Sequence, residues 1–190
     1  MFKKLYRYIR RLFIPYGLIV GNDLKFILED KILKYYTTDS VQDTSVDVRL
    51  GEIIFRESYP DFGENVFVVG ENTISMYTEH LPIKKLSNVF LRPNEFILGS
   101  LKEYIKLPKD IYADFTIRSK PARGGLNHSI ATPINPGWEG FLRLELTNDC
   151  IHHTALLWDG MPIGTLRLYK CKKVKGYNGT TQCQVITKIQ

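Results

Sequence analysis

The sequence predicts a mostly β fold of the sandwich, jelly-roll or small-barrel kind. From Val41 onward, short runs rich in β-branched and aromatic residues alternate with Gly, Pro, Asn and Asp. No helical pattern of about 10 to 15 residues lies between these runs, which argues against a parallel α/β sheet. At 190 residues, 44% hydrophobic and 24% charged, the chain is long enough for one domain with a sizeable core.

The first 13 residues have the pattern of a basic amphipathic helix. We expect this helix to pack its apolar stripe on the domain or on a neighbouring subunit, leaving its cations in water. Anchoring to a membrane surface or an acidic partner is the alternative. Its cations are five of the chain's 26 basic residues, and the other 21 are balanced by 20 acidic residues, so we expect no extended nucleic-acid surface. The five are Lys3, Lys4, Arg7, Arg10 and Arg11.

Residues 12–20 form a short apolar run that we do not interpret as a signal peptide. Pro15 and Gly17 interrupt it, and no small-residue cleavage site follows. The run is also shorter than the about 20 residues that span a bilayer. We therefore divide the chain into a basic amphipathic extension, residues 1–21, and a β domain, residues 22–190.

The domain is predicted to begin with a short helix and to continue as strands. Asn22 or Asp23 is the expected helix cap, with Leu24, Ile27 and Leu28 buried. The predicted strands share apolar or β-branched character between turn residues. They are residues 46–50, 53–55, 66–69, 96–98, 111–117, 141–146, 156–158 and 166–169.

Cysteine and histidine usage predicts neither a disulfide framework nor a structural zinc site. The chain has three cysteines, an odd number, without a CxxC spacing. This usage suits a reducing cytosol, so we expect a cytoplasmic protein. The four histidines also lack the spacing of metal ligands.

Two segments concentrate the residues suited to chemistry. Residues 116–125 hold three cations, a hydroxyl-bearing serine and two glycines, a composition expected close to phosphate oxygens. Ser119 and Arg123 are four residues apart and would share one side of a helical turn, in which Pro121 suits an early position. In the second segment, residues 141–147, Leu144 and its apolar neighbours face one side of a strand and Glu145 faces the other.

Five motifs, in order, resemble the dCTP deaminases, a family of the trimeric dUTPase-like superfamily. The resemblance covers about residues 22–179 and implies a distorted jelly roll or β-barrel of the dUTPase-like type. It also implies a homotrimer with sites between subunits. The motifs are Ser45-Val46-Asp47-Val48-Arg49-Leu50-Gly51, residues 91–100, Arg118-Ser119-Lys120-Pro121-Ala122-Arg123, residues 128–140 together with 144–148, and Gly160-Met161-Pro162-Ile163-Gly164.

The resemblance implies hydrolytic deamination of dCTP to dUTP and ammonia in pyrimidine deoxynucleotide metabolism. The H-x-E and P-C-x-x-C signature of zinc deaminases does not occur in this sequence, so we expect no zinc cofactor. A lone carboxylate must then act as both base and acid, which requires partial desolvation. By resemblance this is Glu145, with Ser119 holding the water and Arg123 orienting the carboxylate.

The remaining site residues are also expected by resemblance. Mg²⁺ would arrive with the triphosphate, held by phosphate oxygens and water. Ile134 would lie under the deoxyribose, and Tyr177 belongs to a segment that faintly resembles the family's cover over the nucleotide. The phosphate-binding candidates are Arg118, Ser119, Lys120 and Arg123, and the base- and sugar-binding candidates are Ile130, Ala131, Ile134, Asn135 and Tyr177.

One departure from the family bears directly on the product. Asn135 stands where the family usually has an aspartate that, in dUTPases and bifunctional deaminases, helps position the water attacking the α-phosphate. An amide cannot act as that base, so we expect dUTP as the product, with dTTP a candidate inhibitor. Two alternatives stay open: a bifunctional enzyme making dUMP, and a non-catalytic descendant that binds nucleotide or serves as a scaffold.

Overall fold

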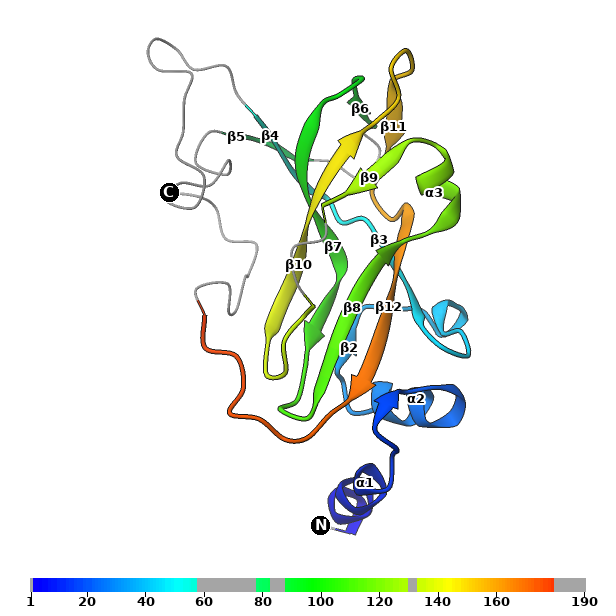
Figure 1. Ribbon diagram of the computed structural model, residues 1–190, viewed down its shortest axis with the longest axis vertical. Coiled ribbons are helices and arrows are strands. Elements are labelled where there is room, and N and C mark those ends of the chain that lie inside the picture. The colour runs from blue at the N-terminus through cyan, green and yellow to red at the C-terminus, as the bar shows by residue number, and fades with distance from the viewer. Residues whose placement is uncertain (1, 58–77, 83–87, 130–132, 180–190) are drawn as a thin grey trace.

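The computed structural model describes residues 2–57, 78–82, 88–129 and 133–179, and over this part of the chain it confirms a mostly β fold (Figure 1). Two antiparallel sheets enclose one core, and a two-stranded sheet lies beside them. The predicted strand at residues 66–69 lies outside the described residues. The other predicted strands all form, most of them longer than expected.

The first sheet is organised around one long strand, β12 (Pro162–Lys170). It pairs along most of its length with β8 (Ile111–Ile117). It also pairs with β3 (Val46–Arg49) through its first half and with the two-residue strand β1 (Gly17–Leu18) at its end. Alternate residues of β3, β8 and β12 are buried, as expected for strands with one face on a core.

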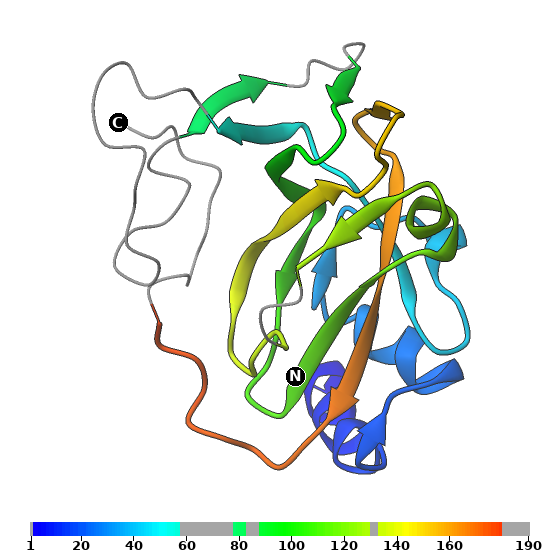
Figure 2. The same ribbon diagram turned by 45° about the horizontal axis from the view of Figure 1, so that its top comes forward.

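The second sheet is organised around β7 (Phe96–Lys106), which pairs with β10 (Glu139–Asn148) over nearly its whole length. Two further strands pair with β7, and one more extends the sheet at each side. Figure 2 shows β7 and β10 facing β8 and β12 across the core. The additional strands are β2 (Leu33–Lys34), β4 (Ile53–Glu57), β5 (Thr78–Pro82) and β9 (Leu126–His128), while β6 (Val89–Leu91) and β11 (Ala155–Leu157) form the separate pair.

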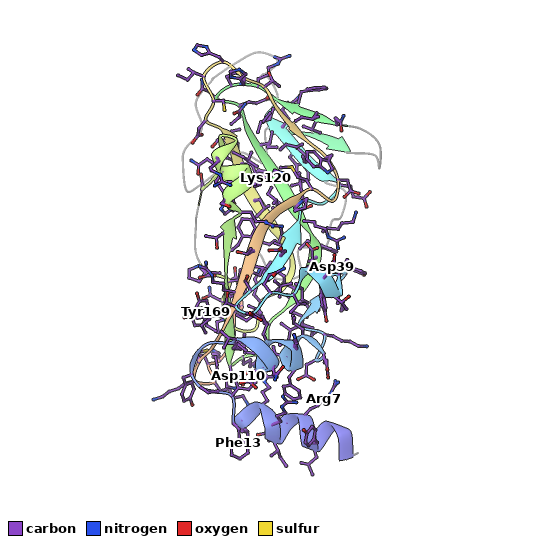
Figure 3. The ribbon with its side chains drawn as sticks, turned by 90° about the vertical axis from the view of Figure 1, so that its right-hand side faces the viewer. Arg7, Phe13, Asp39, Asp110, Lys120 and Tyr169 are labelled. Carbon is purple, nitrogen blue, oxygen red and sulfur yellow. The ribbon has the colours of Figure 1, made fainter. Side chains whose placement is uncertain are left out.

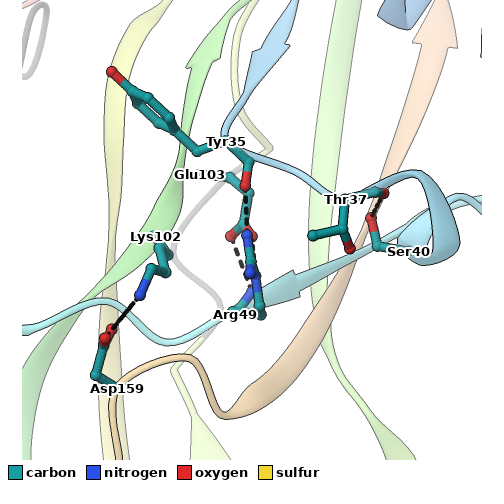
Figure 4. Close-up of polar contacts among 7 residues, drawn as sticks. All are labelled: Tyr35, Thr37, Ser40, Arg49, Lys102, Glu103 and Asp159. Carbon is teal, nitrogen blue, oxygen red and sulfur yellow. Dashed lines mark hydrogen bonds and ion pairs between the residues drawn. The ribbon is translucent and has the colours of Figure 1, made fainter. Parts of the chain in front are cut away.

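Strand β7 continues eight residues beyond its predicted end because two charged residues inside it have partners. Glu103 is fully buried, and its carboxylate accepts hydrogen bonds from the backbone N–H (2.9 Å) and Nε (2.8 Å) of Arg49 (Figure 4). Burial raises the pKa of Glu103, although the bonds from Arg49 oppose that rise. Lys102 pairs with Asp159 at 2.7 Å, joining β7 to the turn before β12.

Helix α2 (Gly21–Leu28) begins one residue before the earlier of the two predicted caps. Its cap residue is Val20, which makes no side-chain capping bond, and the N–H of Gly21 instead donates to the carbonyl of Asp43 at 2.7 Å. The predicted buried residues are confirmed, and Phe26 joins them. A 3-10 turn, η1 (Thr38–Ser40), follows before β3.

Helix α1 (Phe2–Leu12) forms as predicted, but its basic residues, and not its apolar stripe, contact the body of its own chain. Packing of the apolar stripe on a neighbouring subunit stays a prediction. Arg7 pairs with Glu29 and Asp30 and points toward the body, whereas Phe13, just after the helix, points away from it and is 80% exposed (Figure 3). Leu5, Ile9 and Leu12 are exposed with Phe13. In the described part of the chain, no helix is long and apolar enough to cross a membrane.

The basic face of α1 contacts the domain because the neighbouring surface carries carboxylates and helix α2 has no exposed apolar stripe to receive it. The apolar residues of α2 are already buried in the core, so they cannot receive a second apolar stripe. The neighbouring surface instead presents carboxylates, including Asp110, which pairs with both Arg11 and Lys170. The guanidinium of Arg10 also lies over the ring of Phe26, at 4.2 Å from its centre.

We predict that Glu103→Ala lowers the free energy of unfolding by about 3 kcal/mol, since it leaves Arg49 without its buried partner. Urea unfolding followed by circular dichroism measures the change. The exposed Glu52→Ala is the control and is expected to stay within about 0.5 kcal/mol of the parent protein. Equal stability of the two variants would contradict this role for Glu103.

We predict that Arg11→Gln loosens α1 while leaving the Asp110–Lys170 pair in place. Burial alone would raise the pKa of Asp110, but the bonds from Lys170 and Arg11 outweigh burial and hold it below its ordinary value of 3.8. The contribution of the Arg11–Asp110 pair to the attachment of α1 is therefore complete above that value and is lost as pH falls below it. Amide hydrogen exchange of residues 2–12 should speed up in Arg11→Gln at pH 7 and not in the control Lys25→Gln. Unchanged exchange would show that the Arg11 contact does not hold the helix.

Candidate active site

Glu145 lies on β10, which two neighbouring strands hold in register. At the start of β10, Glu139 accepts a hydrogen bond from the hydroxyl of Tyr104 and pairs with Lys106, both at 2.6 Å. These bonds from β7 lower the pKa of Glu139. A bulge between Phe141 and Arg143 follows, and beyond it Leu144 and Leu146 are fully buried on one face. Glu145 faces the other side with 33% of its side chain exposed, so the predicted alternation is confirmed beyond the bulge.

The side chain of Glu145 lies close to that of His128, the last residue of β9. The β9–β10 register places His128 opposite Leu146, and the N–H of Ser129 donates to the carbonyl of Glu145 at 3.1 Å. Nε2 of His128 lies 3.3 Å from Oε2 of Glu145. The pair is within ion-pair distance but is not aligned as a hydrogen bond, since both ring nitrogens are buried without a hydrogen-bond partner in the described chain.

The aromatic ring of Phe115 covers His128. The two rings meet edge to face, with centres 5.0 Å apart. Behind Phe115 lies Gly164, where an added Cβ would lie only 2.1 Å from Cε2 of the phenylalanine ring. Gly164 therefore lets Phe115 lie against β12, and Phe115 in turn limits the exposure of the imidazole to 10%.

The predicted phosphate-binding residues lie on and beside a short helix, α3 (Ser119–Arg123), which confirms the expected helical turn. Lys120 and Arg123 are exposed, and neither has an ion-pair partner among the residues that the structure describes. Arg118, the cap residue, is instead engaged by Asp47 of β3 at 3.1 Å. Ser119 is exposed at the first position of the helix, and Figure 3 marks Lys120 on its surface.

A third group forms where the C-terminal segment meets the turn before β10. The N–H of Tyr177 donates to the carbonyl of Pro136 at 2.8 Å, which places the half-buried Tyr177 beside the exposed Asn135. Gly137 has a φ of 85°, and a Cβ there would lie 3.0 Å from Cα of Gly176, so the close approach needs glycine. Ile134 is buried and exchanges backbone hydrogen bonds with Ala113.

One chain does not unite all of the predicted site residues. Glu145 contacts His128, and the backbone of Tyr177 is bonded to Pro136, the residue after Asn135. Within the described ranges, no ion pair or hydrogen bond joins Ser119 or Arg123 to Glu145. The predicted base-binding residues Ile130 and Ala131 lie outside the described residues.

Sequence analysis missed His128, Asp47 and Asn148. Asn148 is fully buried, and its amide donates to the carbonyls of Leu91 (2.9 Å) and His153 (2.8 Å), which fixes the loop after β10. All three residues lie inside the family-like motifs, and their place in those motifs could have indicated that they are functional. Their partners are distant in sequence or across strands, so spacing alone did not reveal their contacts.

No protein metal cluster is evident in the part of the chain described. Groups of three or more His, Cys, Asp or Glu side chains able to hold a metal ion do not occur among these residues.

Comparisons with known proteins show which family the chain resembles. The model of the dCTP deaminase-like family matches residues 21–171. A dUMP-forming dCTP deaminase of Bifidobacterium adolescentis is 38% identical over 141 residues, which are 71% of this chain and 68% of that protein. One of Nanoarchaeum equitans is 31% identical over 172 residues, covering 83% and 86% of the two chains.

A solved structure supports the fold. The crystal structure of 2′-deoxycytidine 5′-triphosphate deaminase from Agrobacterium tumefaciens is similar with a TM-score of 0.64 at 19% identity. The match covers 82% of this chain and 48% of that one, so this chain spans about half of its length. The dUTPase-like fold expected from the motifs is thus confirmed, and the chain belongs to the dCTP deaminase-like family.

Proposed function

We propose that the protein hydrolytically deaminates dCTP and carries the product on to dUMP. The deaminase step rests on the carboxylate of Glu145, which is one-third exposed on an apolar-backed strand and has a buried imidazole at its side. The dUMP product is proposed from the relatives, because the proteins of Bifidobacterium adolescentis and Nanoarchaeum equitans are dUMP-forming dCTP deaminases. The relatives thus favour the dUMP-forming alternative over the dUTP product expected from Asn135.

In the deamination step, Glu145 takes a proton from a water that attacks C4 of cytosine. The same carboxylate then delivers a proton to the leaving amino group, so that dCTP and water give dUTP and ammonia. Partial burial suits a carboxylate with both tasks. Ser119 is assigned to hold the water, and Arg123 to orient Glu145 and to counter charge that develops on the base.

The triphosphate is assigned to the cations around α3. Lys120 and Arg123 are free for phosphate oxygens, while Arg118 would have to share or leave Asp47. Mg²⁺ would accompany the nucleotide and neutralise phosphate charge. Hydrolysis of dUTP by a second water would then give dUMP and pyrophosphate.

A homotrimer would complete this site. Within one chain, no described contact brings Ser119 or Arg123 to Glu145, although the mechanism needs all three at one substrate. An arrangement with α3 of one subunit facing β10 of another would satisfy that need. Asn135 and the half-buried Tyr177 would then belong to the part of the site that surrounds the base and sugar.

A second candidate product, dUTP, is favoured by one specific observation. Asn135 is exposed beside Tyr177, and its amide cannot accept a proton from the water that attacks the α-phosphate. If that water depends on residue 135 alone, the reaction would stop at dUTP.

We predict that Glu145→Gln lowers the rate of ammonia release from dCTP by roughly 10²–10⁴-fold, because the amide cannot shuttle the proton. Nucleotide affinity, measured by calorimetry with dCTP and Mg²⁺, should change little. The exposed Glu52→Gln serves as the matched control with parental activity. A fully active Glu145→Gln would remove this residue from the mechanism.

We predict that chromatography of the products from dCTP will show dUMP and pyrophosphate, with dUTP, CTP and dCMP as comparison substrates. Asn135→Asp should then leave the product unchanged. If the parent protein instead accumulates dUTP and Asn135→Asp releases dUMP, the second candidate is correct. Absence of deamination with dCTP would overturn both.

A further inference from the structure

We propose that His128 is a positioning residue for Glu145, an inference that rests on the proposed function. In this proposal Nε2–H of the imidazole donates to Oε2 of Glu145. The other carboxylate oxygen then remains free for the attacking water. The imidazole would thereby fix which oxygen acts on the substrate.

The geometry already brings the two groups together. Their β9 and β10 backbones are hydrogen-bonded neighbours, and Nε2 lies 3.3 Å from Oε2. The atoms lack hydrogen-bond alignment in the free chain, so a small rotation of either side chain would complete the bond. Apo sites commonly hold such contacts long or misaligned until the substrate is bound.

A purely structural role does not explain the imidazole well. His128 is about nine-tenths buried, yet neither of its nitrogens has a hydrogen-bond partner among the described residues. An unsatisfied buried polar group is costly, and a ring that only packed against Phe115 could be apolar. The one polar group within ion-pair reach of the imidazole is the proposed catalytic carboxylate, again considering the described chain alone.

The surroundings hold the imidazole in place for this task. Phe115 covers its ring edge to face, and Gly164 gives Phe115 the space to do so. From the other side, the backbone N–H of His128 donates to the side-chain oxygen of Asn127 at 2.8 Å. The contact with Phe115 therefore restricts rotation of the imidazole.

The test compares three single variants of the full-length protein in steady-state deamination of dCTP. His128→Phe keeps the ring and the contact with Phe115 but removes the donor. We expect kcat to fall on the order of 100-fold, as for a misplaced catalytic group, while KM stays within about twofold. His128→Gln places an amide donor close to the position of Nε2 and should recover about tenfold of the loss. His152→Gln, at an exposed histidine, is the control with parental kcat.

Each outcome decides the proposal. A loss in kcat with partial rescue by glutamine supports positioning. Parental kcat in His128→Phe, or equal loss in the phenylalanine and glutamine variants, overturns it while the deaminase function stands. If His128→Phe does not fold, the glutamine variant decides: a loss of about tenfold in kcat supports positioning, whereas parental kcat or a loss of about 100-fold contradicts it. A parent protein that deaminates no dCTP would overturn the proposed function and this inference together.

Discussion

The packing of Phe115 against Gly164 is the contact on which the candidate site depends. The ring fills the space where any β-carbon at position 164 would lie, and its other side meets the edge of His128. Because Gly164 belongs to β12 and His128 to β9, this one ring connects the two sheets at the level of Glu145. A core with native packing density transmits even small displacements, so a shift of β12 would reach the imidazole and the carboxylate beside it.

Charged residues inside the β structure are accommodated by partners far along the chain. Glu103 on β7 meets Arg49 on β3, and Lys102 meets Asp159 in the turn before β12. These pairs tie the central strand of the second sheet to elements of the first. Asp159 lies directly before the Gly160–Gly164 motif, and its pairing with Lys102 joins that turn to β7. Removing one member of such a pair lowers the free energy of unfolding by more than the intact pair contributes to it, because the other charge stays buried without a partner.

Much of the fold was predictable because its strands follow local patterns. β8 and β12 show clear alternation, and the glycine, proline and serine of the α3 region marked a turn close to phosphate chemistry. The two-residue strands β1 and β2 have too few residues for any period to appear. The apolar run predicted for β7 ends at Leu98, before Gly99 and Ser100. Farther along the strand, only the distant partner Arg49 makes the charge of Glu103 compatible with a core.

Helix α1 shows that an amphipathic pattern does not fix which face of a helix contacts its own domain. The sequence of α1 predicts its amphipathic character. Which face contacts the domain depends on the carboxylates of Glu29, Asp30 and Asp110, which lie outside the helix. Because α1 is secured through its arginines, Leu5, Ile9 and Phe13 contribute nothing to holding it on a single subunit. Substitutions of these residues therefore leave the folding of the domain unaffected. Selection on them acts only through whatever contacts the exposed face of α1.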